Sequence, residues 1–427
     1  MNRRIVIYGM NYAPEIAGVG RYTGEIGEHF AKLGYETRVI TTPPHYPGWI
    51  PRPSHSPRRW TREVVAGVAV YRCPLWLHPD MKGLRRLLAP LSFALSSAPI
   101  AFWQILRRRP DVVIAVEPTL LVAPIALLAA RLAGARTVLH VQDLEVDAAF
   151  AVGHLRTRSL QRIALAFERL VMTGFDRVIT ISGRMAERLA DKGVRPERIE
   201  IVRNWVDVEA ISPMASAGAY RTELGLRNED FVVLYAGTIG AKHGLGLLIE
   251  AARRLAARPD IVFVIAGEGP MRSEIEQAAK ILPNLRVMDF QPQERFGDFL
   301  ALADVHVLPQ ERAAADLVLP SKLGGMLASG RPVIVTADPG TELAEFVGTS
   351  CVLTPPGDAA ALAEAIVRLS SEPASAGQAS ERLARARQLS LCVGIQDFTT
   401  AALSPEPPTA AASAPQAPVA APTSVCR

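Results

Sequence analysis

The chain has 427 residues, of which 49% are hydrophobic and 21% charged. This length corresponds to two or three domains, and the balance excludes a disordered, collagen-like or coiled-coil chain. The four cysteines, Cys73, Cys351, Cys392 and Cys426, form no C-x-x-C pair. The sequence therefore predicts neither a disulfide scaffold nor a cysteine zinc site, and it favours a reducing compartment.

Charge is unevenly distributed along the chain. Residues 1–203 carry 29 Lys and Arg against 17 Asp and Glu, a net +12, whereas the remainder carries 18 against 25, a net −7. We therefore expect two lobes with different partners. A basic lobe suits an anionic lipid surface or a phosphate-bearing ligand, and without blocks of lysine it does not indicate a nucleic-acid partner.

The first residues run straight into a short apolar strand at Ile5–Tyr8. The longer apolar core and the small-residue cleavage site of a signal peptide are both missing from this stretch. We therefore expect a chain that begins in the cytoplasm, and that begins with folded structure.

Short β-branched runs alternate with helical stretches along the whole chain, in two series. This rhythm is typical of a parallel sheet covered on both faces, so each series predicts a doubly wound α/β domain. We expect an N-terminal domain at 1–205, a C-terminal domain at 206–400 and a disordered Pro/Ala-rich tail at 401–427. The predicted strands are Ile5–Tyr8, Thr37–Thr41, Val112–Val116, Thr137–Val141, Arg177–Ile181, Phe231–Ala236, Ile261–Ala266, Leu285–Phe290, Val305–Leu308 and Pro332–Thr336.

Residues Leu87–Leu106 carry no charge over 20 positions and are flanked by arginines on both sides. This length just reaches that of a membrane span, although Pro90 and Pro99 interrupt it. Three interpretations stay open: a spanning helix, a packed helix of the domain, and a helix that lies on the membrane face with its arginines drawn to anionic lipid.

Two groups of residues in the first half lie where predicted strands end. Gly18 and Gly20 precede a helix, where glycines let backbone amides approach a phosphate, although a tight turn explains them equally well. His140 and Asp143 end the fourth strand, and polar groups there suit a catalytic or sugar-binding role; a structural histidine is the alternative. No metal-ligand cluster is found, so we expect no metal and no other cofactor.

Glycine loops and cations recur in the second half. Gly237, Thr238 and Lys242 follow a buried strand, and loop amides with a lysine would neutralise a diphosphate leaving group. Gly267, Glu268 and Gly269 follow the next strand, at the edge where open α/β sheets bind ligands. A structural turn is the alternative interpretation of these residues. Further along, Asp316, Pro320, Ser321 and Lys322 precede a helical stretch, which Ser321 would cap, and a lysine in a first helical turn suggests an anionic ligand.

Taken together, these segments resemble the family 4 retaining glycosyltransferases of the GT-B fold, over about residues 3–400. Within the family the chain is similar to the group that acts in colanic acid biosynthesis. The order and spacing of the pieces carry the resemblance more than any one of them. The matching pieces are NYAPEIAGVGRYTGEIGEHFAKLGYETRVIT, ITISGRMAERL, IVRNWVD, LYAGTIGAKHGLGLLIEAARRL, VIAGEGP and PSKLGGMLASGRPVI.

The resemblance implies two Rossmann-like domains that face each other across a cleft, with the nucleotide-sugar donor on the C-terminal domain and the acceptor on the N-terminal one. It also implies retention of the anomeric configuration without a bound metal. Two departures stand out. Thr238 occupies the place of the family's arginine, and Gly325 occupies the place of its second glutamate, for which Asp316 is the nearest acid. The family's histidine corresponds to His140 or is displaced by Gln142.

The sequence thus predicts a cytoplasmic hexosyl or deoxyhexosyl transferase, peripheral on the inner face of the cytoplasmic membrane. It would move a sugar from a nucleoside-diphosphate donor, with GDP-fucose suggested by the resemblance, onto a lipid-linked exopolysaccharide repeat unit. Lys242 and Lys322 would stabilise the leaving group, with His140 and Asp143 as the other catalytic candidates. Two alternatives stay open: a nucleotide-sugar epimerase of the same fold, and a non-catalytic sugar-binding scaffold.

Overall fold

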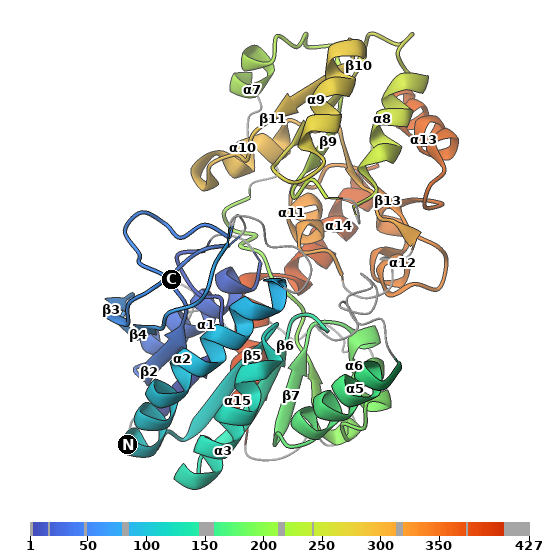
Figure 1. The fold of residues 1–427 in the computed structure, drawn as a ribbon. Helices are drawn as coiled ribbons and strands as arrows, with labels where there is room; N and C mark the ends of the chain where they lie inside the picture. Colours follow the sequence, from blue (N-terminus) through green and yellow to red (C-terminus); the bar gives the residue numbers. More distant parts are fainter. Residues whose placement is uncertain are drawn as a thin grey trace. The chain divides into compact units, whose positions relative to one another are not determined.

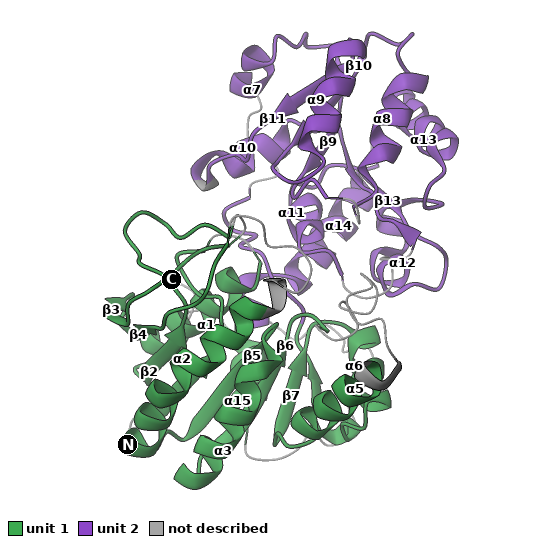
Figure 2. Cartoon of the chain, viewed as in Figure 1, with its two compact units in different colours: residues 1–202, 395–427 green, residues 203–394 purple. Residues whose placement is uncertain are grey.

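The computed structural model describes residues 3–15, 18–46, 49–78, 85–144, 158–211, 218–240, 243–312, 319–372 and 375–404. The chain divides into two compact units, which Figure 2 shows in two colours. Unit 1 comprises residues 1–202 and 395–427, and unit 2 comprises residues 203–394. Each unit contains one largely parallel β-sheet with helices packed on it (Figure 1), which confirms the doubly wound α/β class.

The sheet of unit 1 has the strand order β3-β4-β2-β1-β5-β6-β7-β8. Its strand pairs are parallel, except that β3 and β4 form an antiparallel hairpin at the edge. Because the chain first moves outward from β1 and then returns to its other side, β1 and β5 flank the topological switch point. The strands are β1 (Arg4–Tyr8), β2 (Glu36–Thr41), β3 (Thr61–Val65), β4 (Val68–Arg72), β5 (Val112–Glu117), β6 (Arg136–Val141), β7 (Arg177–Thr180) and β8 (Ile199–Ile201).

The helices of unit 1 begin and end at recognisable signals. Gly134 ends one helix in the left-handed conformation, and the Ser182 hydroxyl caps another by accepting a hydrogen bond from the Met185 amide at 3.1 Å. The helices are α1 (Val19–Lys32), α2 (Arg85–Arg108), α3 (Ala123–Ala133), α5 (Arg158–Met172), α6 (Gly183–Asp191) and α15 (Leu391–Leu403), of which α15 starts in unit 2.

Helix α2 packs on the sheet along one face. Its residues Ala89, Phe93, Ser97, Ala101 and Ile105 are fully buried, and the Phe93 ring lies edge-on to Tyr8 of β1, 5.9 Å between ring centroids. Spacing of four residues places these side chains on one side of a helix. The stretch Leu88–Arg108 is long and apolar enough to cross a membrane by length and composition alone, and 44% of its most apolar window is buried. Of the three interpretations of this stretch, the packed helix therefore applies to the buried face of α2.

The sheet of unit 2 has the order β11-β10-β9-β12-β13-β14, and its strand pairs are all parallel. Here the chain leaves β9 in one direction and returns to its other side at β12, so the switch point lies between β9 and β12. The strands are β9 (Phe231–Ala236), β10 (Ile261–Ala266), β11 (Leu285–Met288), β12 (Val305–Leu308), β13 (Val333–Thr336) and β14 (Val352–Thr354).

The helices of unit 2 bury apolar faces in three core clusters. Asp358 caps one of them by accepting hydrogen bonds from the Ala360 and Ala361 amides. The helices are α7 (Gly218–Glu223), α8 (Leu245–Arg254), α9 (Arg272–Ile281), α10 (Phe296–Ala301), α11 (Lys322–Ala328), α12 (Glu342–Val347), α13 (Ala359–Ser371) and α14 (Ala376–Gln388).

The units differ from the expected domain limits at both ends of the second domain. The division falls after Val202 rather than after 205, and residues from Ile395 onward belong to unit 1 rather than to the domain expected at 206–400. The physical reason is α15, whose Phe398 ring lies 6.5 Å from Phe30 of α1 and 4.8 Å from His140 of β6. This helix continues to Leu403, and the tail from residue 405 lies outside the described residues.

Candidate functional site

The loop after β9 leaves the sheet of unit 2 at its switch point. Two backbone hydrogen bonds join this loop to the loop after β10: the Gly237 amide donates to the Ala266 carbonyl at 2.9 Å, and the Ile239 amide donates to the Glu268 carbonyl at 2.8 Å. A Cβ at Gly267 would lie 1.9 Å from the Gly237 carbonyl oxygen. The two loops therefore approach each other more closely than a side chain would allow.

Gly269 has the same structural reason to be glycine. Its φ is +153°, and a Cβ there would lie 2.1 Å from the Ile239 carbonyl oxygen. The structural turn that the sequence left open for this segment therefore accounts for both glycines. The neighbouring Glu268 is exposed and forms an ion pair with Arg272 at 2.7 Å. Contact of this segment with a donor stays a prediction.

Lys322, the first residue of α11, points back to the loop after β9. Its Nζ donates a hydrogen bond to the Tyr235 hydroxyl at 2.6 Å and lies 4.4 Å from the centroid of the Tyr235 ring. A Cβ at Gly237 would lie 2.8 Å from that Nζ, so glycine leaves room for the ammonium group. The structure thus brings Lys322 and Gly237 together, and their contact with a donor stays a prediction.

Tyr235 is a residue that sequence reasoning missed. Its hydroxyl accepts from Lys322 and donates to the Thr238 carbonyl at 2.7 Å, and so fixes both the lysine and the loop. Burial raises the pKa of Tyr235, which keeps the phenol protonated as a donor. The available signal was the position of this tyrosine, one residue before the end of an otherwise apolar strand at the switch point.

The structure contradicts one prediction on the stretch before α11, and it does not describe two of the predicted site residues. The predicted capping by Ser321 is wrong: Ser321 has helical dihedral angles, φ −58° and ψ −23°, and makes no side-chain cap. An N-cap serine that accepts from the first turn typically has extended dihedral angles. The Pro320 carbonyl accepts from the Leu323 amide at 2.9 Å. Lys242 and Asp316 lie outside the described residues.

Gly325, which the resemblance matches to the family's second glutamate, lies in an apolar environment. A Cβ there would meet Leu300 at 3.4 Å and Ile211 and Phe296 at 3.7 Å. A carboxylate at this position would be buried without a partner, so this part of α11 serves packing in this chain.

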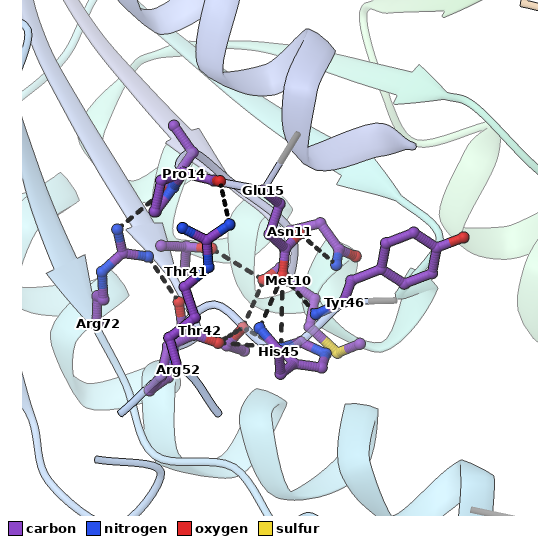
Figure 3. A network of polar contacts seen from close by, with 12 residues as sticks. Met10, Asn11, Pro14, Glu15, Thr41, Thr42, His45, Tyr46, Arg52 and Arg72 are labelled. Atoms are coloured by element: carbon purple, nitrogen blue, oxygen red, sulfur yellow. Dashed lines mark hydrogen bonds and ion pairs between the residues drawn. The ribbon is translucent and has the colours of Figure 1, made fainter. Parts of the chain in front are cut away.

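The corresponding loop of unit 1 follows β1 and contains a buried carboxylate that sequence reasoning also missed. Figure 3 shows Glu15 at the centre of a polar network that joins this loop to the segment after β2. Glu15 is 4% exposed, and a Cβ at Gly20 would lie 2.4 Å from its Oε2. Gly18 has φ +64°, and a Cβ there would lie 3.2 Å from the Tyr46 ring. The tight packing that the sequence left open therefore accounts for both glycines, and their contact with a donor stays a prediction.

His140 lies inside unit 1, under α15. It is 1% exposed, its ring packs against Phe398, and Gln142 Nε2 donates to its Nε2 at 3.0 Å. Burial lowers the pKa of His140 to about 3, so the ring is neutral near pH 7. Asp143, three residues further on, is exposed. The structure therefore keeps Gln142 and His140 in one hydrogen-bonded pair, and of His140 and Asp143 only Asp143 faces solvent.

Groups of three or more His, Cys, Asp or Glu side chains able to hold a metal ion are not found among the residues that the structure describes. Two further acids that follow Asp143 in the sequence, Glu145 and Asp147, lie outside these residues.

Models of known protein families match most of the chain. Residues 17–205 match the model of the glycosyl transferase 4-like domain, and residues 230–372 match that of glycosyl transferases group 1. The chain is 40% identical over 356 residues to the Escherichia coli K12 protein named as the colanic acid biosynthesis glycosyl transferase WcaI, which covers 81% of this chain and 86% of the relative.

Solved structures show the same fold. The sucrose-phosphate synthase of Thermosynechococcus elongatus superposes with a TM-score of 0.71 at 17% identity, covering 93% of this chain and 98% of that one. HepE of Anabaena, solved in complex with UDP-glucose, superposes with a TM-score of 0.63 at 16% identity, again over 93% and 98%. These likenesses confirm the GT-B fold class, with two Rossmann-like domains, that the resemblance implied.

Proposed function

The chain belongs to the family 4 glycosyltransferases, and we propose that it transfers a sugar from a nucleoside diphosphate to a lipid-linked acceptor in exopolysaccharide synthesis. The relative at 40% identity is named for colanic acid biosynthesis, which supports this process. GDP-fucose is the donor that the resemblance of the sequence leads us to test first.

The observation that carries the proposal is the position of the Lys322 ammonium group. It lies against Gly237 at the switch point of unit 2, where open α/β sheets bind ligands, and the Tyr235 hydroxyl fixes it there. When the glycosidic bond breaks, negative charge develops on the departing diphosphate. A preorganised cation and loop amides stabilise that charge without further rearrangement.

This chemistry also suits retention of configuration. The acceptor hydroxyl would attack from the face that the diphosphate leaves, and the departing phosphate oxygen would take its proton. Lys242 would add a second cation from the same loop, and Asp143 would contact the acceptor or the sugar. We assign the buried His140 a supporting role beneath these residues rather than direct contact, because its ring is enclosed by α15.

A lipid-linked acceptor requires the protein to reach a membrane surface, and α2 has an outer face suited to it. The helix contains no Asp or Glu and ends in Arg107 and Arg108, which are exposed. Its exposed face is apolar, with Leu88, Leu91, Leu95, Trp103 and Leu106 at 40 to 69% exposure. We therefore propose a peripheral location on the inner face of the cytoplasmic membrane.

The experiment incubates purified protein with labelled UDP-, GDP- and dTDP-sugars, with and without polyprenyl-diphosphate-linked sugar. We expect nucleoside diphosphate to be released only when both donor and acceptor are present, together with a longer lipid-linked product. Release without acceptor would indicate hydrolysis or epimerisation, and no release with any donor would indicate a binding scaffold; either result contradicts the proposal.

A further inference from the structure

Two loops of unit 1 emerge at the same edge of its sheet. One follows β1 and leads to α1, and the other follows β2. Because β1 and β2 are parallel neighbours, with Tyr8 paired to Ile40, their carboxyl ends meet at one edge. This is the edge, next to the switch point, where doubly wound sheets bind ligands.

The Glu15 carboxylate joins these two loops. Its Oε1 accepts hydrogen bonds from the backbone amides of His45 and Tyr46, both at 3.0 Å, and its Oε2 accepts from Asn11 Nδ2 at 2.9 Å (Figure 3). Hydrogen bonds to an ionised acceptor are roughly twice as strong as neutral ones. One carboxylate from the first loop therefore fixes the backbone of the second.

A buried cation joins the same loops through their carbonyl groups. Arg72, at the end of β4 and 1% exposed, donates to the Ala13 carbonyl at 2.8 Å and to the Thr42 carbonyl at 3.0 Å. The segment after β2 is thus held at Thr42 by the cation and at His45 and Tyr46 by the anion. Such double attachment leaves little freedom for the residues between and beside these points.

The held segment presents one aromatic ring to solvent. His45 is 2% exposed and anchors the segment, whereas the next residue, Tyr46, is 42% exposed. Its ring packs beside Gly18 and projects away from the polar network (Figure 3). The side chain thus offers an apolar ring and a phenolic hydroxyl at the ligand-binding edge, while Glu15 fixes its backbone amide.

We propose that Tyr46 contacts the acceptor sugar and that Glu15 is the positioning residue that holds it there. An aromatic ring covers the C–H face of a pyranose and its hydroxyl pairs with a sugar hydroxyl, a combination of apolar and polar surface that suits an uncharged sugar ring. The inference rests on the proposed function and on the acceptor lying on the N-terminal domain, as the resemblance implies. It adds the residue that touches the acceptor and the device that fixes that residue.

The kinetic test compares Tyr46→Ala, Glu15→Ala and Glu15→Gln, with Glu28→Gln on the following helix as the matched control. Glu28 forms an exposed ion pair with Lys32 on α1, 3.0 Å between the charged atoms. We expect Tyr46→Ala and Glu15→Ala to raise the KM for polyprenyl-diphosphate-linked sugar at least ten-fold, and to leave the KM for the donor within two-fold. Because the side-chain carbonyl oxygen in Glu15→Gln still accepts from both amides, this variant restores the acceptor KM to within about three-fold of the wild type.

Hydrogen exchange tests the positioning role without any activity. We expect the amides of His45 and Tyr46 to exchange at least ten-fold faster in Glu15→Ala than in the wild type, and at wild-type rates in Glu28→Gln. Unchanged exchange would overturn the role of Glu15, and equal changes in acceptor and donor KM for Tyr46→Ala would overturn the sugar contact. Because Tyr46 is exposed, its variant tests the contact even if Glu15→Ala fails to fold. A wild type without transferase activity contradicts the proposed function, and the exchange result still stands.

Discussion

At the residue scale, the position of Lys322 leads to a direct prediction. The Lys322→Ala variant removes one preorganised positive charge beside the loop after β9. Loss of one such donor costs roughly 3 kcal/mol of transition-state stabilisation, so we expect kcat to fall about 100-fold or more. Steady-state assay of diphosphate release measures it, and circular dichroism checks that the fold is intact.

The control for this variant is Lys280→Ala. Lys280 is an exposed lysine in the last turn of α9, in the same unit, and its loss should leave kcat unchanged. Near-normal turnover of the Lys322 variant would contradict the assignment. The sequence makes the same prediction for Lys242→Ala, although that residue lies outside the described part of the chain.

At the scale of a single element, the packing of α11 around Gly325 leads to a prediction. The Gly325→Glu variant would restore the family's glutamate, but the side chain would enter the contact between Leu300, Ile211 and Phe296. Burial of an unpaired carboxylate is costly, so we expect a loss of several kcal/mol in the free energy of unfolding and no gain in donor affinity. Urea unfolding and donor titration measure both. A stable variant with tighter donor binding would show that position 325 faces the ligand.

The central strands of both sheets contribute a dependence on pH. His140 of β6 and His306 of β12 are fully buried, and burial lowers the pKa of each to about 3, well below the value of about 6.5 in an unfolded chain. Below pH 6.5 the unfolded chain therefore binds a proton at each of these histidines, whereas in the folded chain both stay neutral until the pH approaches 3. Their contribution to stability is complete above pH 6.5, and is lost as the pH falls from 6.5 towards 3.

Each of these histidines lowers the free energy of unfolding by about 1.4 kcal/mol per pH unit within that window. We expect urea midpoints to fall steeply between pH 6 and pH 4.5. In His306→Gln the slope of the free energy of unfolding of unit 2 against pH should decrease by the contribution of one histidine. This holds even if the variant is less stable at pH 7. An unchanged slope would show that His306 does not titrate differently in the two states.

At the scale of the whole molecule, the apolar strands made the architecture predictable. Runs such as Phe231–Ala236 and Ile261–Ala266 are buried on both faces, and their predicted bounds match the structure residue for residue. The hairpin β3-β4 was missed because it lies at a sheet edge, where half-exposed residues give no continuous apolar signal. The C-terminal helix α15 was placed in the wrong unit, because chain order alone does not reveal a final crossover.

The candidate site was less predictable than the fold. Glycines and lysines at strand ends are visible in the sequence, but the reason for each glycine depends on what lies opposite it. Gly20 faces the Glu15 carboxylate and Gly269 faces a backbone carbonyl, and both partners are set by folding. Tyr235 and Glu15 were missed for the same reason: Tyr235 acts through Lys322 of α11, and Glu15 acts through the segment after β2, and folding sets both contacts.

We expect the protein to bind anionic liposomes through the outer face of α2. The exposed leucines and Trp103 would enter the lipid interface, while Arg107 and Arg108 approach anionic headgroups. Each basic residue at such a surface contributes about 1 kcal/mol, and salt screens this attraction within a Debye length. We therefore expect co-sedimentation with liposomes of anionic lipid that weakens as salt rises.

Variants separate this face from general hydrophobicity. The double variant Leu95→Glu/Trp103→Glu places two negative charges in the exposed stripe and should reduce liposome binding at least ten-fold. Ile281→Glu is the control, because Ile281 is 80% exposed but belongs to unit 2. Retention through high salt and carbonate would mean that α2 crosses the bilayer, and no binding to any lipid would remove the membrane proposal. Helix α2 packs on the sheet through its opposite face. Reversible binding that the double variant weakens would therefore show that the apolar stripe and the arginines act together as one membrane-facing surface.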